Sequence, residues 1–219
     1  MKTDDLIRHL SANATPVRRL PPAWAQAAQW LLVALFSVAL VVLLVSPRPD
    51  LAVKLGEMRF LIEEGAAFAT AVTAAMAAFC LATPGHSRKL ALLPAVPLAL
   101  WFTSLGLDCL RAWLAFGWKA FQVELDWVCL PAIAMVGAVP ALAIVAMLRR
   151  GAPLAPRMTV MLGGLAAAAI GDFGLRLFHP QDAGLTVLIW QFGSVLLFSA
   201  LAGWSGHFFL RWRHVRLAG

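Results

Sequence analysis

Six long apolar runs constrain the fold of this chain more than any other feature of its sequence. A membrane-spanning α-helix needs about 20 predominantly apolar residues, and short polar loops separate the six runs. We predict membrane helices at residues 24–45, 60–82, 90–109, 127–148, 158–178 and 185–204. The expected fold is therefore an all-α, polytopic membrane protein, a six-transmembrane-helix bundle with short loops.

Little of the chain remains for a separate soluble domain. Of its 219 residues, 61% are hydrophobic and 13% are charged, too few polar side chains to cover a soluble domain of this length. The predicted organisation is an N-terminal segment at residues 1–22, the transmembrane bundle at residues 23–205 and a basic tail at residues 206–219.

Basic residues are distributed unevenly between the two faces of the predicted bundle. Twelve of the 18 Lys and Arg residues fall on the face that carries both ends of the chain. Because cytoplasmic loops are enriched in Lys and Arg, both termini are predicted to be cytoplasmic, the N-in/C-in arrangement. The net charge of +7 is then explained by the Lys and Arg residues of the cytoplasmic loops and termini. Direct nucleic-acid binding is not expected, since there is no nucleic-acid motif and no basic run of five residues.

Two cysteines flank the connector between the third and fourth apolar runs. Cys109 ends the third run and Cys129 begins the fourth, so both are expected at the outer ends of two neighbouring helices. Thiols in this position could form a disulfide if their α-carbons come within about 4.4–6.8 Å. They could also hold Cu(I) or a similar thiophilic metal ion. Two unrelated packing cysteines are the alternative, and Cys80, in an Ala-rich run, is expected to be a packing residue.

Polar residues near these cysteines are auxiliary candidates. Asp108 and Asp126 lie close to the two thiols in the sequence and would disfavour the thiolate form unless a cation were bound. His179 is expected on the same outer face and is a candidate third ligand, although a single loop histidine is usually just exposed.

The N-terminal segment contains a short amphipathic pattern. Asp4 and Asp5 occupy the first turn of a predicted helix, where acidic residues are favourable. Leu6, Ile7 and Leu10 form an apolar stripe at helical spacing. The segment is predicted either to dock a cytoplasmic partner or to be a frayed tail or an interfacial helix that lies on the lipid surface.

The fifth run is expected to be the most tightly packed helix, because it is rich in Gly and Ala. Asp172 and Arg176 are spaced i,i+4 on this run, so we predict that they form a structural ion pair.

Two other functional classes were weighed against a regulator. A small transporter, channel or metal-handling membrane protein would need ionisable groups near the membrane centre, whereas the acidic and basic residues within the runs gather toward one end. An enzyme is not expected, since no CxxC, HExxH, GxSxG or phosphate-binding loop occurs. Two cysteines 20 positions apart could still exchange disulfides with a substrate.

Several short stretches, taken in order, resemble the NrsF family of integral-membrane anti-sigma factors (negative regulators of sigma F) over nearly the full length. They are M-K-T-D-D-L-I at 1–7, V-R-R-L at 17–20, A-L-W-F-T-S-L-G-L-D-C-L-R at 99–111, D-W-V-C-L-P at 126–131, L-R-R-G-A-P-L at 148–154 and G-L-R-L-F-H-P-Q-D at 174–182.

The resemblance implies a function that the composition alone does not. The chain would hold an extracytoplasmic-function sigma factor, of the sigma F type, at the cytoplasmic face of the bacterial inner membrane. It would release this partner when Cys109 and Cys129, on the periplasmic side, sense metal or oxidative stress. The expected partners are the sigma factor and the lipid bilayer, with no required cofactor and no obligatory small-molecule substrate.

Overall fold

The computed structural model describes residues 3–12, 20–117, 128–180 and 184–209, and within these ranges all regular structure is helical. The side chains of Leu10, Asp108 and residues 207–209 lie outside the description. The helices are α1 (Thr3–Ala12), α2 (Ala23–Val45), α3 (Leu51–Lys54), α4 (Met58–Ala82), η1 (Arg88–Leu92), α5 (Ala95–Phe116), α6 (Cys129–Leu148), α7 (Pro156–Arg176), α8 (Gly184–Thr186), η3 (Val187–Phe192) and α9 (Gly193–Phe209).

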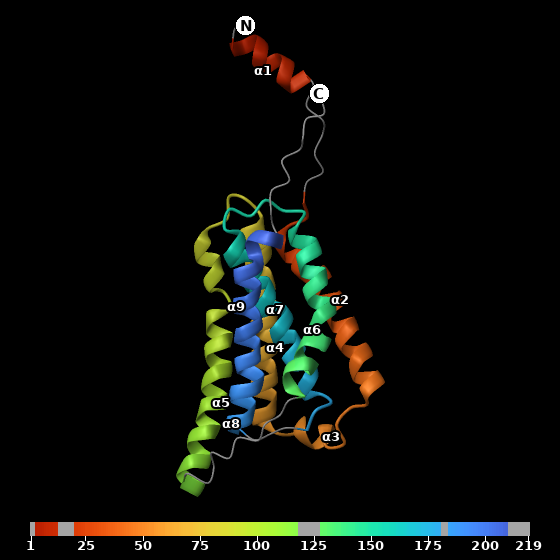
Figure 1. Ribbon diagram of the computed structural model, residues 1–219, viewed down its shortest axis with the longest axis vertical. Helices are drawn as coiled ribbons and strands as arrows, with labels where there is room; N and C mark the ends of the chain where they lie inside the picture. Colours follow the sequence, from red (N-terminus) through yellow and green to blue (C-terminus); the bar gives the residue numbers. More distant parts are fainter. Residues whose placement is uncertain (1–2, 13–19, 118–127, 181–183, 210–219) are drawn as a thin grey trace.

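The six predicted membrane helices are confirmed. Six helical segments of the described chain are long and apolar enough to cross a membrane. Helix α2 begins and α9 ends at the same end of the bundle (Figure 1), as an even number of spans requires. We refer to this end as the terminal end and to the other, which carries α3 and α8, as the α3 end.

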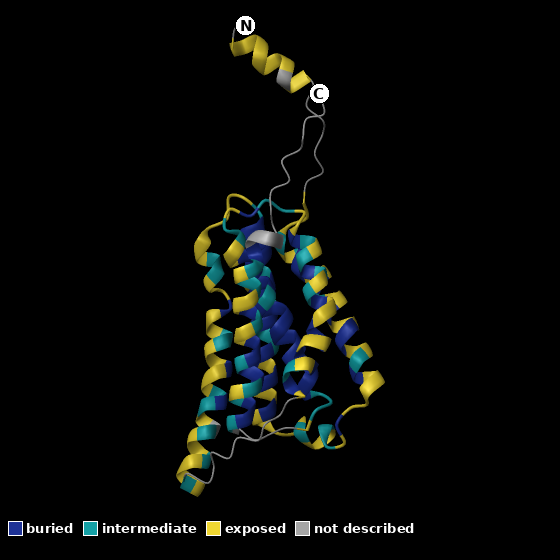
Figure 2. Cartoon of the chain, viewed as in Figure 1, coloured by how far each residue is buried: buried dark blue, intermediate teal, exposed yellow. Residues whose placement is uncertain are grey.

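Helix α7 lies at the centre of the bundle and packs against α4, α6 and α9, while α5 packs on the outer side of α4 (Figure 1). Most side chains of α4 and α7 are buried, whereas those of α5 are largely exposed (Figure 2). The expectation that the fifth apolar run is the most tightly packed is confirmed, because α7 has the largest buried share of the six spans.

Glycines on three sides of α7 let its neighbours approach closely. A methyl group at Gly171 would lie 2.8 Å from a backbone oxygen of α6, and one at Gly174 would lie 2.7 Å from a side chain of α6 and 3.0 Å from a side chain of α2. Gly164 faces Ala202 of α9 too closely for any larger side chain. Small residues at helix interfaces are the usual means of packing in a membrane, where no hydrophobic force drives the helices together.

The third span is longer than predicted. Helix α5 continues to Phe116, seven residues beyond Cys109, so the first part of the expected connector is helical. The helix ends at Gly117, which has a φ of 59°. A glycine in this left-handed conformation is a common helix terminator, and residues 110–116 contain no residue that would end the helix earlier.

Candidate functional site

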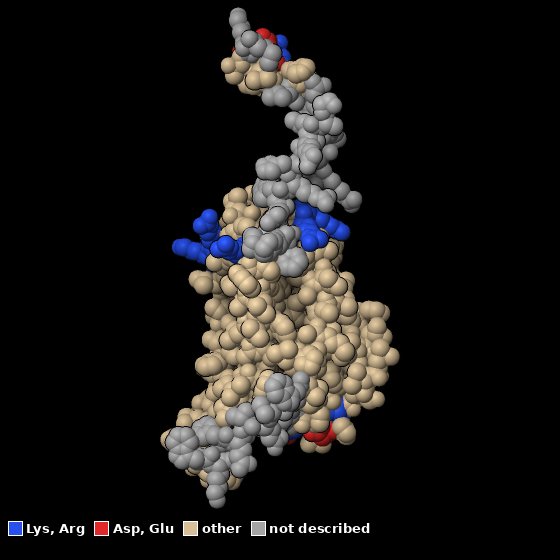
Figure 3. All heavy atoms as spheres, in the orientation of Figure 1, with Lys and Arg blue, Asp and Glu red and all other residues tan. Residues whose placement is uncertain are grey.

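The two ends of the bundle differ in charge. Exposed Lys and Arg side chains gather at the terminal end, whereas acidic and basic side chains are mixed at the α3 end (Figure 3). Among the described residues of the bundle, the basic ones at the terminal end are Arg88, Lys89, Arg149, Arg150 and Arg157. This distribution agrees with the asymmetry read from the sequence, and the cytoplasmic location of this end stays a prediction.

At the α3 end, one buried arginine joins two helices. The guanidinium of Arg176, the last residue of α7, lies 2.8 Å from Glu63 and 2.9 Å from Glu64 of α4. All three side chains are less than a tenth exposed. The guanidinium also lies over the ring of Phe60, 5.2 Å from its centroid. These contacts join the start of α4 to the end of α7.

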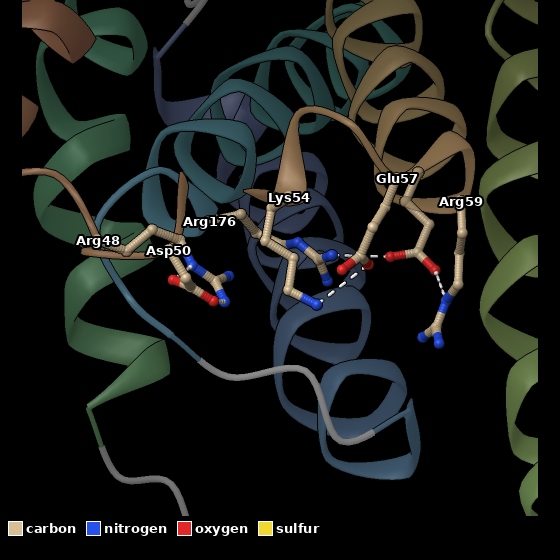
Figure 4. Close-up of polar contacts among 7 residues, drawn as sticks. Arg48, Asp50, Lys54, Glu57, Arg59 and Arg176 are labelled. Carbon is tan, nitrogen blue, oxygen red and sulfur yellow. Dashed lines mark hydrogen bonds and ion pairs between the residues drawn. The ribbon is translucent and has the colours of Figure 1, made fainter. Parts of the chain in front are cut away.

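Three further ion pairs, each with at least one partly exposed member, lie near this centre (Figure 4). Arg59 Nε lies 3.0 Å from Glu63, and Lys54 Nζ lies 3.1 Å from Glu57. Arg48, which follows α2, pairs with Asp50 at 2.7 Å. The backbone N–H of Arg48 also donates to the carbonyl of Leu177, at 3.0 Å. The connection from α2 to α4 is thereby attached to the end of α7.

Arg176 therefore has interhelical carboxylate partners that the sequence analysis did not predict. Asp172, predicted as its partner, lies one turn earlier on α7 and is buried, and its Oδ1 has no hydrogen-bond partner among the described residues. The Asp172–Arg176 pair stays a prediction. One sequence feature could have predicted the observed contacts. Glu63 and Glu64 are adjacent in the sequence and lie at the same predicted membrane depth as Arg176.

The two outer cysteines occupy different surroundings. Cys129, the first residue of α6, is fully buried and packs with Ile133 and with Leu175 of α7. Cys109 is half-buried on α5. The seven residues from Cys109 to the end of α5 correspond to roughly 10 Å of helix. Cys109 is thus inside its helix rather than at its end, contrary to the prediction.

Helices α5 and α6 do not pack along each other, so the expectation of two neighbouring helices is also wrong. Helix η3, a single π-helical segment, contacts both of them. The ring of Phe192 on η3 lies 5.3 Å from that of Trp101 and 5.4 Å from that of Phe102, both on α5. Trp190, also on η3, packs against the cluster that contains Cys129. Because η3 contacts both α5 and α6, it is the structural link between the two cysteine-bearing helices. Segments of π-helix occur frequently at functional sites.

The auxiliary residues do not complete a metal site within the described chain. His179 is half-buried and its backbone N–H donates to the carbonyl of Leu175 at 2.8 Å. Asp126 and the side chain of Asp108 lie outside the described residues. No three His, Cys, Asp or Glu side chains in the described ranges gather closely enough to hold a metal ion. Metal binding at Cys109 and Cys129 stays a prediction.

The predicted N-terminal helix is present as α1, with Asp4 and Asp5 in its first turn. It lies outside the bundle (Figure 1), and Leu6 and Ile7 are 41% and 58% exposed. The side chain of Leu10 is outside the description. Ten residues are too few for a stable isolated helix in water, so this exposed apolar stripe is suited to a partner or a surface.

Comparison with known protein families gives a match that covers most of the chain. The family model described as NrsF, negative regulator of sigma F, matches residues 10–212, nearly the whole chain. No curated protein and no solved structure matches.

Proposed function

Because the chain belongs to the NrsF family, the negative regulators of sigma F, we propose that it holds a sigma factor of the extracytoplasmic-function type at the cytoplasmic face of the bacterial inner membrane. Its family makes it an anti-sigma factor, and its six apolar helices make it a multi-pass membrane protein. The observation that carries the proposal is the family match across residues 10–212.

Helix α1 is the proposed docking segment for the sigma factor. Its apolar residues Leu6 and Ile7 are exposed, and its acidic first turn adds charge beside them. An amphipathic helix of this kind binds by laying its apolar face into a groove of its partner. In this proposal Asp4 and Asp5 orient the helix, while Leu6, Ile7 and Leu10 fill the groove.

Cys109 and Cys129 are the proposed sensors of thiophilic metal or oxidant. Support comes from the packing of Cys129 against Leu175, the residue directly before Arg176 on the central helix. A metal ion or an oxidised sulfur at position 129 would need space that this buried cluster does not have. Helix α7 or η3 would then shift, and α7 extends to the terminal end. A coupling of about 1–3 kcal/mol changes affinity about 5–150-fold.

The positions of the buried charges favour a regulator over a transporter. Among the described residues, the buried charged side chains are Arg48, Glu63, Glu64, Asp172 and Arg176, and all lie near the α3 end. A transport pathway would place such groups near the middle of the membrane.

Replacing both Leu6 and Ile7 with Asp tests the docking segment. We expect the sigma factor to no longer co-purify with the full-length protein, and its target genes to be transcribed without a stress. Arg8→Gln is the matched control, since Arg8 is also exposed on α1 and lies outside the apolar stripe. Retention of the sigma factor by the double variant would place docking elsewhere.

Serine substitutions test the sensors. Cys109→Ser and Cys129→Ser are each expected to abolish the transcriptional response to copper or to a thiol oxidant, because the proposed site needs both sulfurs. Cys80→Ser is the control, since Cys80 lies near the C-terminus of α4, at the opposite end of the bundle from Cys129. Thermal unfolding of each purified variant separates loss of sensing from loss of folding. A full response in the folded Cys109→Ser variant would exclude the paired-cysteine sensor while leaving sigma-factor docking intact.

A further inference from the structure

An apolar groove opens on the surface of the bundle near its terminal end. One wall is formed by the last two turns of α6, from Ala141 to Leu148, and by Arg149 directly after them, and the other wall is formed by Ala202 of α9. Val160, Gly163 and Gly164 of α7 form the floor. The volume of the groove is about 540 Å³, within the range of about 300–1,000 Å³ that is typical of ligand pockets.

The packing of three helices explains why the groove is present. Helices α6 and α9 both pack closely on α7 and only loosely on each other. Gly163 lies against Leu148 of α6 and Gly164 lies against Ala202 of α9, so α7 forms the floor of the space between the two outer helices. Leu142 and Ala146, on the α6 wall, are exposed, so in a membrane the groove opens toward the hydrocarbon of the bilayer.

One basic residue lines the groove, and a second lies nearby on α7. Arg149 directly follows the last residue of α6 and lines the groove. Arg157, exposed in the first turn of α7, has its backbone against the end of α9, where a methyl group at Gly206 would lie 3.0 Å from its α-carbon. The acidic residues of the bundle whose side chains are described, Asp50, Glu57, Glu63, Glu64 and Asp172, all lie toward the α3 end.

We propose that this groove binds one anionic phospholipid, with an acyl chain along the apolar floor and the phosphate beside Arg149. Lipid chains are as apolar as leucine, so the groove itself does not distinguish one phospholipid from another. Selection comes from the headgroup, because basic pockets between membrane helices attract anionic lipids. The site does not depend on the cysteines or on the sigma factor.

The test is native mass spectrometry of the full-length protein with an equimolar mixture of phosphatidylglycerol and phosphatidylcholine. The wild type is expected to retain phosphatidylglycerol preferentially. Arg149→Gln should reduce this retention about fivefold, the effect of one basic residue near an anionic lipid. Arg88→Gln, at the same end but outside the groove, should leave it unchanged. Equal retention by the two variants would overturn the assignment of Arg149.

A second pair of variants tests the groove by shape. Ala146→Phe should fill it and expel the lipid, whereas Ala138→Phe, also exposed on α6 but outside the groove, should not. Lipid retention by a folded Ala146→Phe variant would exclude the site.

Two further outcomes would also overturn the proposal. Glycerol phosphate has no acyl chain, so displacement of the lipid by glycerol phosphate would show that the groove does not hold the chain. A dimer that Ala146→Phe disrupts and Ala138→Phe preserves would show that the groove is occupied by a second copy of the protein.

Discussion

Helices α7 and α5 have similar lengths and both are apolar, yet one is the core of the bundle and the other its outer edge. In the span that contains α7, 78% of the most apolar window is buried, against 17% in the span that contains α5. Gly and Ala dominate the buried face of α7, whereas α5 presents Leu, Phe and Trp to the outside.

The difference shows that side-chain size, rather than hydrophobicity, distinguishes the inner helix from the outer one. Lipid is as apolar as a leucine side chain, so large apolar residues have no reason to avoid it. Small residues allow close approach and the van der Waals contacts that come with it. Substitutions on α7 should therefore lower the free energy of unfolding, whereas equivalent substitutions on the outer helix α5 should change it little.

The largest effect is expected at Arg176. Arg176→Leu leaves the carboxylates of Glu63 and Glu64 buried without their shared cation, which should lower the free energy of unfolding by about 3–5 kcal/mol. Arg59→Leu removes a guanidinium that is 48% exposed and should cost no more than about 1 kcal/mol. Denaturant unfolding in mixed micelles measures both. Similar losses in the two variants would mean that the buried pair has no special role.

A glycine pair gives the next contrast. Gly171→Ala places a methyl group 2.8 Å from the carbonyl oxygen of Ile133 and should destabilise the protein by about 1–3 kcal/mol. Gly106→Ala on α5 meets no atom within 4 Å and should be neutral or stabilising by up to about 1 kcal/mol, because alanine favours the helix. Thermal unfolding of both variants is the measurement, and a stable Gly171→Ala protein would contradict the close α6–α7 packing.

The smallest effect is expected for a tryptophan pair. The indole N–H of Trp30, fully buried on α2, donates to the carbonyl of Pro140 on α6 at 2.9 Å. Trp30→Phe should lower the free energy of unfolding by about 0.5–1.5 kcal/mol. Trp113→Phe, at a position 40% exposed on α5, should change it by less than about 0.5 kcal/mol. If Trp30→Phe lowers the free energy of unfolding more than Trp113→Phe does, the contrast between buried and exposed helix faces extends to α2. Equal losses would contradict it.

The sequence predicted what depends on local pattern. The lengths of the apolar runs indicated the six spans, and the Gly-rich run indicated the central helix. The end of α5 was missed, although Gly117 marked it. A glycine after an apolar run was a sufficient signal for a longer third helix.

Contacts between distant segments could not be predicted in this way. Arg176 and Glu63 are 113 positions apart, and their pairing depends on α4 and α7 being neighbours. The order of the apolar runs likewise led to the expectation that the helices of Cys109 and Cys129 would be neighbours. The structure inserts η3 from the last span between them, because connectors limit distance without fixing which helix fills the space.

Between them, Gly164, Gly171 and Gly174 face three neighbours of α7, since Gly164 faces α9, Gly171 faces α6 and Gly174 faces both α6 and α2, and this has a mechanical consequence. Turning α7 about its own axis would drive bulkier side chains into the places where these glycines stand, so torsion is blocked on three sides at once. A displacement that starts near Cys129 would then move α6, α7 and α9 together as a small shear. The loops at the terminal end would shift together in one direction and would not rotate relative to one another.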